Sequence, residues 1–427
     1  MALLNLQKTI FTIKELLSGN KIINNLEDID SYFKGNNKFD HLEKLLKHAV
    51  STTVFYKLYD SESISNFPVI NKTKIKERFS DFSSSKFSGK SLIEMTTSGS
   101  TGTPFRVFQN REKKHRNLAD TLYFANLAGY ELGHKLVYFK VLIKAKMSPK
   151  YMYRLQNIIL LDVLKLDESA IQLFIDTMEN DGSQKHSILG YVSALESIIR
   201  YCHKINKKTI DASFKSVITM SEGLSKATKE NLSTLFNCPV VSRYSNIENG
   251  IIAQQLINEE KFLINTASYY IEIMDFESDT IVENGVKGRI VVTDFFNYAM
   301  PLIRYDTGDV GALIIENGKS FLSSVEGRKI DLLFDTNDKP VSSTIIYKIV
   351  WQYHKEINEY QLIQLSKKDY VFKINCDVSF NKENQLISGF KSYLGSDANF
   401  TVEYVDKVPL LDSGKRRKIV NLYKNSI

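Results

Sequence analysis

The most informative part of the sequence is the stretch Thr96-Thr-Ser-Gly-Ser-Thr-Gly-Thr-Pro104. It follows an apolar segment, Ser91–Met95, that we expect to form a strand. Glycines let the backbone approach an anion closely and Ser/Thr hydroxyls add donors, so a strand that runs into such a loop suits phosphate binding. The Lys followed by Ser or Thr that ends a P-loop is missing. Taken alone, the stretch is equally typical of a solvated surface loop.

Length and composition set broad limits on the class of protein. The 427 residues suffice for two or more domains, and 43% hydrophobic with 25% charged residues is ordinary for a globular protein. A net charge of +7 gives slight support to an anionic ligand and little to nucleic acid. Three scattered cysteines suit a reducing cytosol. Without a signal-peptide pattern or a run near the ~18 apolar residues of a membrane span, we expect a cytoplasmic protein.

The order of apolar segments predicts the fold class. Residues 1–90 have mainly helical spacing, and from 91 to about 300 short strands alternate with helices, which indicates α/β layers. After residue 328 a smaller α+β pattern begins. We therefore expect an α/β protein (α+β overall) with a large N-terminal domain, residues 1–328, and a small C-terminal domain, residues 329–427.

Apolar patterns within these two domains predict individual strands and helices. Strands are expected at Lys135–Val141, Ser187–Gly190, Ser216–Thr219, Gly288–Thr293, Tyr360–Leu365, Tyr370–Asn375 and Phe400–Val405. Helices are expected at Thr344–His354 and near 382–394.

Two further clusters carry carboxylates. Arg243-Tyr-Ser-Asn-Ile-Glu-Asn-Gly250 contains Glu248, and a carboxylate near phosphates usually works through bound Mg²⁺ because direct contact would be repulsive. Pro301-Leu-Ile-Arg-Tyr-Asp-Thr-Gly-Asp309 ends in a carboxylate that could accept hydrogen bonds from both hydroxyls of a ribose. A solvated Glu and an ordinary β-turn are the respective alternatives.

Two more clusters carry basic residues. Glu326-Gly-Arg-Lys-Ile-Asp331 places Arg328 at the expected domain junction, where it could contact a nucleotide. Leu411-Asp-Ser-Gly-Lys-Arg-Arg-Lys418 places Lys415 in a turn near the end of the chain. A basic tail on a solvated face is the alternative for this last cluster.

In this order and spacing, the clusters resemble the adenylate-forming superfamily of AMP-dependent acyl- and aryl-CoA synthetases. The phenylacetate–CoA ligase-like branch, which includes CapK-type proteins, is the most similar. Its N-terminal signature resembles Leu42–Ala49, Phe55–Lys57 and Phe67-Pro-Val-Ile-Asn-Lys72, and further similarity lies in Ile188–Leu195, Tyr270–Asp275 and Val292–Arg304. The resemblance therefore covers nearly the whole chain.

The resemblance implies a reaction and its participants. A small-molecule carboxylic acid would be activated with ATP and Mg²⁺ as an acyl-adenylate, with release of pyrophosphate. The acyl group would then pass to CoA, a carrier-protein thiol or an amino sugar. Likeness to CapK-type proteins implies capsular or surface polysaccharide biosynthesis, an analogy at the level of fold. Neither nucleic acid nor a membrane span is expected.

Carried onto this chain, the resemblance also implies roles for single residues. The β- and γ-phosphates would be held by Thr97, Ser98, Gly99, Ser100, Thr101, Gly102 and Thr103, with Thr97 also catalytic. Glu248 would ligate Mg²⁺ and serve catalysis, and Asp309 and Arg328 would bind the ribose. Lys415 would bridge the attacking carboxylate and the α-phosphate, carried on a mobile lid.

The remaining roles concern the hinge and the pockets. Ile330 and Asp331 would form the hinge of the lid. The acid pocket and the adenine site would be drawn from Tyr191, Ser193, Ser221, Glu222, Gly223, Tyr244, Ser245 and Asn246, each of which could equally be a packed structural residue.

Three departures from the superfamily pattern keep other functions open. Asp306 replaces an arginine near the nucleotide site, Ile330 occupies the place of the hinge aspartate, and Ile247 replaces a threonine before Glu248. One alternative is an adenylyltransferase that leaves AMP on its target, as in coenzyme F390 synthetase-like relatives. The other is a non-catalytic nucleotide- or acyl-binding relative. The sequence leaves the acid, the acceptor and the oligomeric state open.

Overall fold

The computed structural model describes residues 2–35, 40–97, 105–142, 149–182, 184–328, 333–341, 346, 349–350, 352–353, 356–376, 380–409 and 417–423. Its N-terminal part is helical, as the sequence predicts. The elements are α1 (Ala2–Ser18), α2 (Lys21–Phe33), α3 (His41–Thr52) and α4 (Lys72–Glu77), with short 3₁₀ turns η1 (Ile64–Asn66), η2 (Phe79–Phe82) and η3 (Ser85–Phe87).

Local chemistry explains where these helices begin. Asp40 precedes α3 and its carboxylate accepts a hydrogen bond from the Glu43 N–H at 2.8 Å. Asn71 precedes α4 and its side-chain oxygen accepts from the Lys74 N–H at 2.9 Å. Both caps satisfy a backbone donor that the first turn of a helix leaves without an intrahelical acceptor. The cap at Asn71 therefore fixes Lys72 as the first residue of α4.

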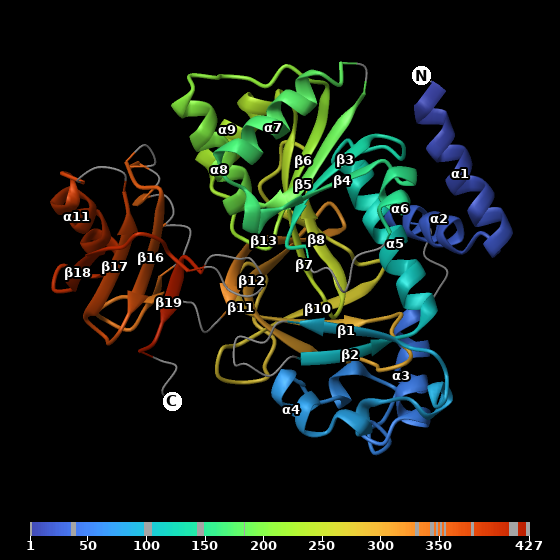
Figure 1. Ribbon diagram of the computed structural model, residues 1–427. Helices are drawn as coiled ribbons and strands as arrows, with labels where there is room; N and C mark the ends of the chain where they lie inside the picture. Colours follow the sequence, from blue (N-terminus) through green and yellow to red (C-terminus); the bar gives the residue numbers. More distant parts are fainter. Residues whose placement is uncertain are drawn as a thin grey trace.

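An 11-stranded mixed sheet forms the centre of the molecule, with strand order β10-β11-β12-β13-β9-β8-β7-β6-β5-β3-β4 (Figure 1). Neighbours pair in parallel within the group β3 (Lys135–Lys140), β4 (Ile158–Asp162), β5 (His186–Tyr191), β6 (Phe214–Met220) and β7 (Val240–Asn246). The other half is antiparallel: β8 (Gly250–Gln255), β9 (Phe262–Ile264), β10 (Tyr269–Met274), β11 (Lys287–Asp294), β12 (Tyr305–Glu316) and β13 (Lys319–Arg328).

Helices cover both faces of the parallel half. One face packs against α7 (Glu168–Glu179), α8 (Val192–Lys204) and α9 (Lys226–Phe236) in the largest apolar core. The other face packs against α5 (Arg111–Leu127). The short α6 (Lys150–Leu155) and η5 (Val163–Lys165) flank β4. Because helices cover both faces of these strands, side chains on both sides of each strand are mostly apolar, which explains the short apolar runs in the sequence.

A separate hairpin precedes the sheet. It pairs β1 (Ile93–Thr97) with β2 (Phe105–Gln109), and Thr97 lies opposite Phe105. The strand expected at Ser91–Met95 is therefore present but begins two residues later. The Gly/Ser/Thr stretch connects the two strands of this hairpin, and its residues 98–104 lie outside the described part of the chain.

The C-terminal part has a sheet and a core of its own. The sheet has four strands in the order β18 (Asn399–Tyr404), β17 (Asp369–Asn375), β16 (Glu359–Gln364) and β19 (Ile419–Asn421). It packs against α11 (Glu383–Leu394), and a small pair joins β14 (Leu333–Phe334) to β15 (Pro340–Val341). In Figure 1 this orange and red part stands beside the large sheet.

The expected elements agree with these bounds to within about two residues, except that the helix expected at Thr344–His354 falls largely outside the described residues. The division at residue 328 stays a prediction, because residues 329–332 are also outside them. None of the helices in the described ranges is long and apolar enough to cross a membrane.

An ion pair joins the two parts. The Lys418 ammonium, just before β19, donates to the Glu196 carboxylate on α8 at 2.7 Å. Burial raises the pKa of Glu196, but the charge and hydrogen bond of Lys418 outweigh it and the pKa is lowered overall. The Glu196 carboxylate is therefore ionised, and its contact with Lys418 fixes where β19 approaches α8.

Close backbone approach in the sheet gives a stability prediction. A Cβ added at Gly288 on β11 would lie 2.1 Å from the Met274 carbonyl oxygen on β10. We expect Gly288→Ala to lower the free energy of unfolding by about 1–3 kcal/mol, measured by urea denaturation. Gly182→Ala is the control, because nothing lies within 4 Å of its added Cβ. Equal stability of the two variants would contradict the packing described here.

Candidate active site

The turn between β7 and β8 carries Glu248, and hydrogen bonds from several elements hold it. Asn246 accepts from the Asn249 N–H at 2.8 Å within the turn. Gln109, the last residue of β2, donates its side-chain amide to the Glu248 carbonyl at 2.9 Å. Tyr269 on β10 donates its hydroxyl to the Asn249 carbonyl at 2.5 Å. The turn is therefore fixed to both the hairpin and the large sheet.

The Glu248 carboxylate is 1% exposed and has two strong partners. The Lys72 ammonium lies 2.9 Å from its Oε1, and the Tyr305 hydroxyl donates to the same oxygen at 2.6 Å. Burial raises the pKa of Glu248, but Lys72 and Tyr305 outweigh burial and lower it overall. The site thus holds an ionised carboxylate in a nearly dry position.

Lys72 reaches this position because its segment pairs with the start of β12. The Ile70 N–H donates to the Arg304 carbonyl at 3.0 Å, and the Asp306 N–H donates to the Ile70 carbonyl at 2.7 Å. The Lys72 ammonium also lies 5.5 Å from the centre of the Phe105 ring, the first residue after the glycine-rich stretch. A lysine therefore lies between that end of the hairpin and Glu248.

Asp309 lies in the same neighbourhood, on β12. The Tyr244 hydroxyl donates to its Oδ2 at 2.8 Å and lies 3.3 Å from Thr307 Oγ1. Burial, and then the Asp309 charge, raise the pKa of Tyr244 well above its usual value, so its hydroxyl stays protonated. Asp309 is the direct cross-strand partner of Arg328 on β13. The fold thus brings these two expected sugar-binding residues side by side, as opposite residues of an antiparallel ladder.

The charge of Asp306, which stands where the superfamily pattern has an arginine, is balanced within the protein. Arg289 on β11 donates to its Oδ2 at 2.6 Å, and the Gly308 N–H donates to its Oδ1 at 2.8 Å. The carboxylate that stands in the place of an arginine is therefore paired. Ile247 is 46% exposed at the β7–β8 turn.

The residues expected in the acid pocket gather where β5 and β6 end. Glu222 accepts from the Ser193 N–H at 2.6 Å and from the Ser193 hydroxyl at 3.0 Å. Because Ser193 lies in the first turn of α8, the carboxylate satisfies an N-terminal helix donor and opposes the helix dipole. Ser221 has a φ of +70°, a left-handed conformation that turns the chain out of β6. Tyr191 directly precedes α8.

Part of the expected site lies outside the described residues. This holds for Ser98, Gly99, Ser100, Thr101, Gly102, Thr103, Ile330, Asp331 and Lys415. The side chains of Thr97 and Arg328 are likewise not described. Gly223 and Ser245 lie next to Glu222 and Tyr244 in the chain, and Asn246 shapes the Glu248 turn.

Sequence reasoning missed Lys72 and Tyr305 as members of the site. Both lie within segments singled out for their family resemblance, Phe67–Lys72 and Pro301–Asp309. The available signals were a lysine at the first position of a capped helix and a tyrosine four residues before the expected ribose carboxylate, Asp309.

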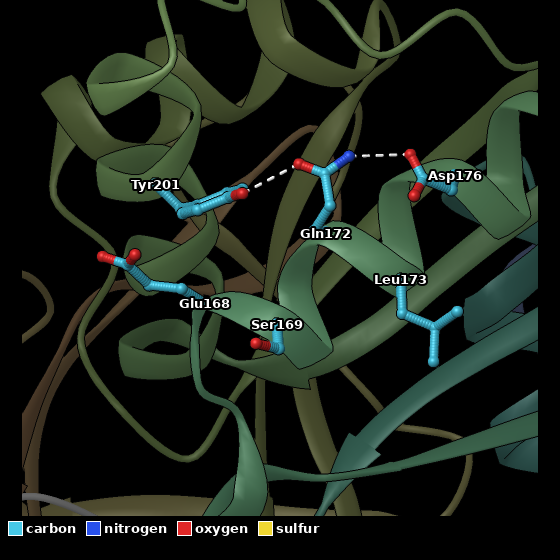
Figure 2. Close-up of a pocket in the computed structure, with 6 residues that line it drawn as sticks. All are labelled: Glu168, Ser169, Gln172, Leu173, Asp176 and Tyr201. Atoms are coloured by element: carbon cyan, nitrogen blue, oxygen red, sulfur yellow. Dashed lines mark hydrogen bonds between the residues drawn. The ribbon is translucent and has the colours of Figure 1, made fainter.

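A surface hollow of about 430 Å³ lies on α7 and α8, away from these motifs (Figure 2). Its lining residues are Glu168, Ser169, Gln172, Leu173, Asp176 and Tyr201. Gln172 accepts from the Tyr201 hydroxyl at 2.8 Å and donates to Asp176 at 2.7 Å. These polar groups satisfy one another, and none belongs to the motif set.

Comparison with solved structures identifies the fold. The chain superimposes on 2-hydroxyisobutyryl-CoA ligase in the postadenylation state, in complex with 2-HIB-AMP, with a TM-score of 0.70 and 14% identity over 89% of this chain and 88% of the other. It also superimposes on ATP-bound MatB from Rhodopseudomonas palustris, with a TM-score of 0.54 and 17% identity over 78% and 66% of the two chains. The fold is that of the adenylate-forming ligases.

Sequence comparison adds two matches to CapK proteins. Residues 333–422 match the family described as the CapK C-terminal domain. The chain is 24% identical to Protein CapK of Staphylococcus aureus over 93% of this chain and 88% of that protein. The chain is therefore similar to a CapK protein over most of its length, and residues 333–422 match the CapK C-terminal domain family.

The electrostatics of Glu248 give a pH prediction. Its folded pKa is lowered, so its ionised form contributes stability above the usual glutamate range, near pH 4.3, and this contribution disappears as the pH falls through the lower folded value. We expect wild type to exceed Glu248→Gln in free energy of unfolding by about 1–3 kcal/mol at pH 7, with the difference shrinking below about pH 4.3.

Denaturant titrations between pH 3 and pH 7 measure this difference. Glu230→Gln, at an exposed position of α9, is the control and is expected to follow wild type throughout. The ion pair would be contradicted if the difference in free energy of unfolding between wild type and Glu248→Gln stayed constant from pH 3 to pH 7.

Proposed function

We propose that the chain is an AMP-forming acid ligase. It activates a carboxylic acid with ATP as an acyl-adenylate, releases pyrophosphate and passes the acyl group to CoA or another acceptor. The observation that carries the proposal is the convergence on one site of Lys72, Glu248, Tyr305, Tyr244 and Asp309, which come from three separate segments. The adenylate-forming fold supports it.

The sugar end of the nucleotide is assigned to Asp309 and Arg328. The Tyr244 hydroxyl orients the Asp309 carboxylate, which can accept hydrogen bonds from ribose hydroxyls. Arg328 adds a cation on the neighbouring strand. Tyr244, Ser245 and Asn246 are proposed to form the side of the adenine site that borders β7.

The phosphate end is assigned to residues 97–103, Lys72 and Glu248. Lys72 supplies beside this hairpin the cation that the Gly/Ser/Thr stretch itself lacks. Glu248 fits an Mg²⁺ site, because one ionised carboxylate together with substrate phosphates is a common way in which proteins hold this ion. When bound, the ion would offset phosphate charge and make attack by a carboxylate less repulsive.

The small C-terminal part is proposed to act as a lid, residues 329–427, that turns about Ile330 and Asp331 and carries Lys415. Lys415 would stabilise charge between the attacking carboxylate and the α-phosphate. The Lys418–Glu196 pair supports a closed arrangement. So do the TM-scores, 0.70 against the postadenylation state of 2-hydroxyisobutyryl-CoA ligase and 0.56 against an open conformation of that ligase.

The acid is proposed to bind where β5 and β6 end, beside Tyr191, Ser193, Ser221, Glu222 and Gly223. Similarity to Protein CapK supports a role in surface polysaccharide biosynthesis, with an amino sugar, a carrier-protein thiol or CoA as acceptor. Because the reaction consumes ATP, the proposal includes a cytoplasmic site of action.

The two alternatives remain distinguishable from this proposal. An adenylyltransferase would leave a stable AMP-modified product that survives gel filtration. A non-catalytic relative would bind ATP without turnover. The pairing of Asp306 with Arg289 weakens this second alternative, because the departure at Asp306 leaves no unbalanced charge beside the nucleotide site.

The test is ATP–pyrophosphate exchange with Mg²⁺ against a panel of aryl, short-chain, hydroxy and amino acids, extended to acids with a second anionic group. We expect exchange that depends on one acid class, and Lys415→Ala should reduce it by about 100- to 1,000-fold because a preorganised charge is lost. Lys72→Met should raise the KM for ATP by about tenfold or more.

Lys407→Ala is the matched control for the first variant, because it removes an exposed lysine from the same C-terminal part. It is expected to keep wild-type exchange. ATP binding without exchange across the extended panel, together with no effect of Lys415→Ala on binding, would contradict the proposed function.

A further inference from the structure

Arg243, on β7, is buried without an acidic partner among the described residues. Its side chain is 6% exposed, and its Nε donates to the Gln254 side-chain oxygen at 2.8 Å. Its Nη2 is buried and has no hydrogen-bond partner. The other buried arginines of the described part differ, since Arg116 pairs with Asp28 and Arg304 pairs with Glu272.

An unpaired buried charge is costly, so it needs an explanation. Burial lowers the pKa of Arg243 to about 10, which leaves the guanidinium charged at neutral pH. Removing a cation from water without an anion or a full set of hydrogen bonds costs several kcal/mol. A bound anion would supply what the described residues do not: a charge partner and an acceptor for Nη2.

Several side chains near Arg243 are more exposed than Arg243 itself. In the register of the sheet, Tyr191, Met220, Arg243 and Gln254 form one row across β5, β6, β7 and β8. Tyr191, Met220 and Tyr138 are only partly buried, whereas Arg243 is buried. A buried guanidinium beside three partly exposed side chains is suited to a ligand that enters over those side chains.

The location connects this group to the proposed acid pocket. The row lies where the parallel strands β5 to β7 end, and ligands of α/β sheets bind beyond the carboxyl ends of the strands. Burial, and then Tyr138 and Glu222, raise the pKa of Tyr191 to about 12, so its hydroxyl stays a neutral hydrogen-bonding group. The next residue of β7, Tyr244, points to the opposite face, where it bonds Asp309.

We propose that Arg243 determines acid specificity, and that the acid carries a second anionic group, a carboxylate or a phosphate, besides the carboxylate that is activated. The inference rests on the proposed function. The planar guanidinium binds such groups through its fork of N–H donors. The second anion would bind Arg243 on one face of β7 while the reacting carboxylate is directed toward the nucleotide.

Matched acids test the proposal in two assays. Isothermal titration with succinate against butyrate, and with 3-phosphoglycerate against glycerate, measures binding directly. The panel extends to dicarboxylates of three to six carbons, and exchange of pyrophosphate into ATP is measured with the same acids. We expect at least one dianionic acid to bind and support exchange more than about 100-fold better than its monoanionic partner, and Arg243→Met to remove that preference.

The outcomes separate this inference from the proposed function. Exchange driven equally well by monoanionic acids, unchanged in Arg243→Met, overturns the role of Arg243 and leaves the ligase function standing. Arg243-dependent binding of a dianion without any exchange supports the anion site and counts against the ligase. A preference for dicarboxylates or for phosphorylated acids identifies the second group.

Thermal unfolding distinguishes a ligand-binding role of Arg243 from a purely structural one. We expect Arg243→Met to keep or raise the melting temperature without ligand, because it removes an unpaired buried charge. Arg304→Met is the matched control and should lower it, because it leaves Glu272 buried without its partner. An equal loss of stability in both variants would overturn the proposal.

Discussion

The ion pair between Glu248 and Lys72 is the interaction on which the rest of the site depends. A carboxylate that is 1% exposed stays ionised because an ammonium at 2.9 Å and the Tyr305 hydroxyl at 2.6 Å share one of its oxygens. These contacts join the N-terminal helical part, the β7–β8 turn and β12. Loss of Lys72 would leave the Glu248 carboxylate buried without a cation, which is far more costly than the pair is stabilising.

Further buried charges help to hold the β7–β8 turn in place. Lys113 on α5 pairs with Asp294 on β11 at 2.7 Å and donates to the Tyr269 hydroxyl at 3.0 Å. Tyr269 in turn donates to the Asn249 carbonyl next to Glu248. Elements of the large sheet thus hold the groups that support the site. A nucleotide would therefore bind to side chains that are already ordered, because folding has already reduced their conformational entropy.

The sequence predicted much of the fold, because strands covered on both faces are short apolar runs and strands alternate with helices as far as α9. The alternation expected as far as about residue 300 was wrong beyond α9, because β7 to β13 follow one another without helices and form the antiparallel part of the sheet. The sequence also singled out Glu248 and Asp309 from local motifs, and their roles stay predictions. It missed Lys72 and Tyr305, because their contacts with Glu248 join distant segments and no local spacing encodes them. The compensation of Asp306 by Arg289 and the isolation of Arg243 are likewise properties of sheet register, visible only when β11, β12, β7 and β8 are paired.

The central claim is that this cluster binds the nucleotide, and a crystal structure with ATP and Mg²⁺ tests it most directly. The account predicts ribose hydroxyls within hydrogen-bond distance of the Asp309 carboxylate and the triphosphate between residues 97–104 and Lys72. A nucleotide that contacts neither Asp309 nor Lys72, or that lies in the hollow on α7 and α8, would contradict it.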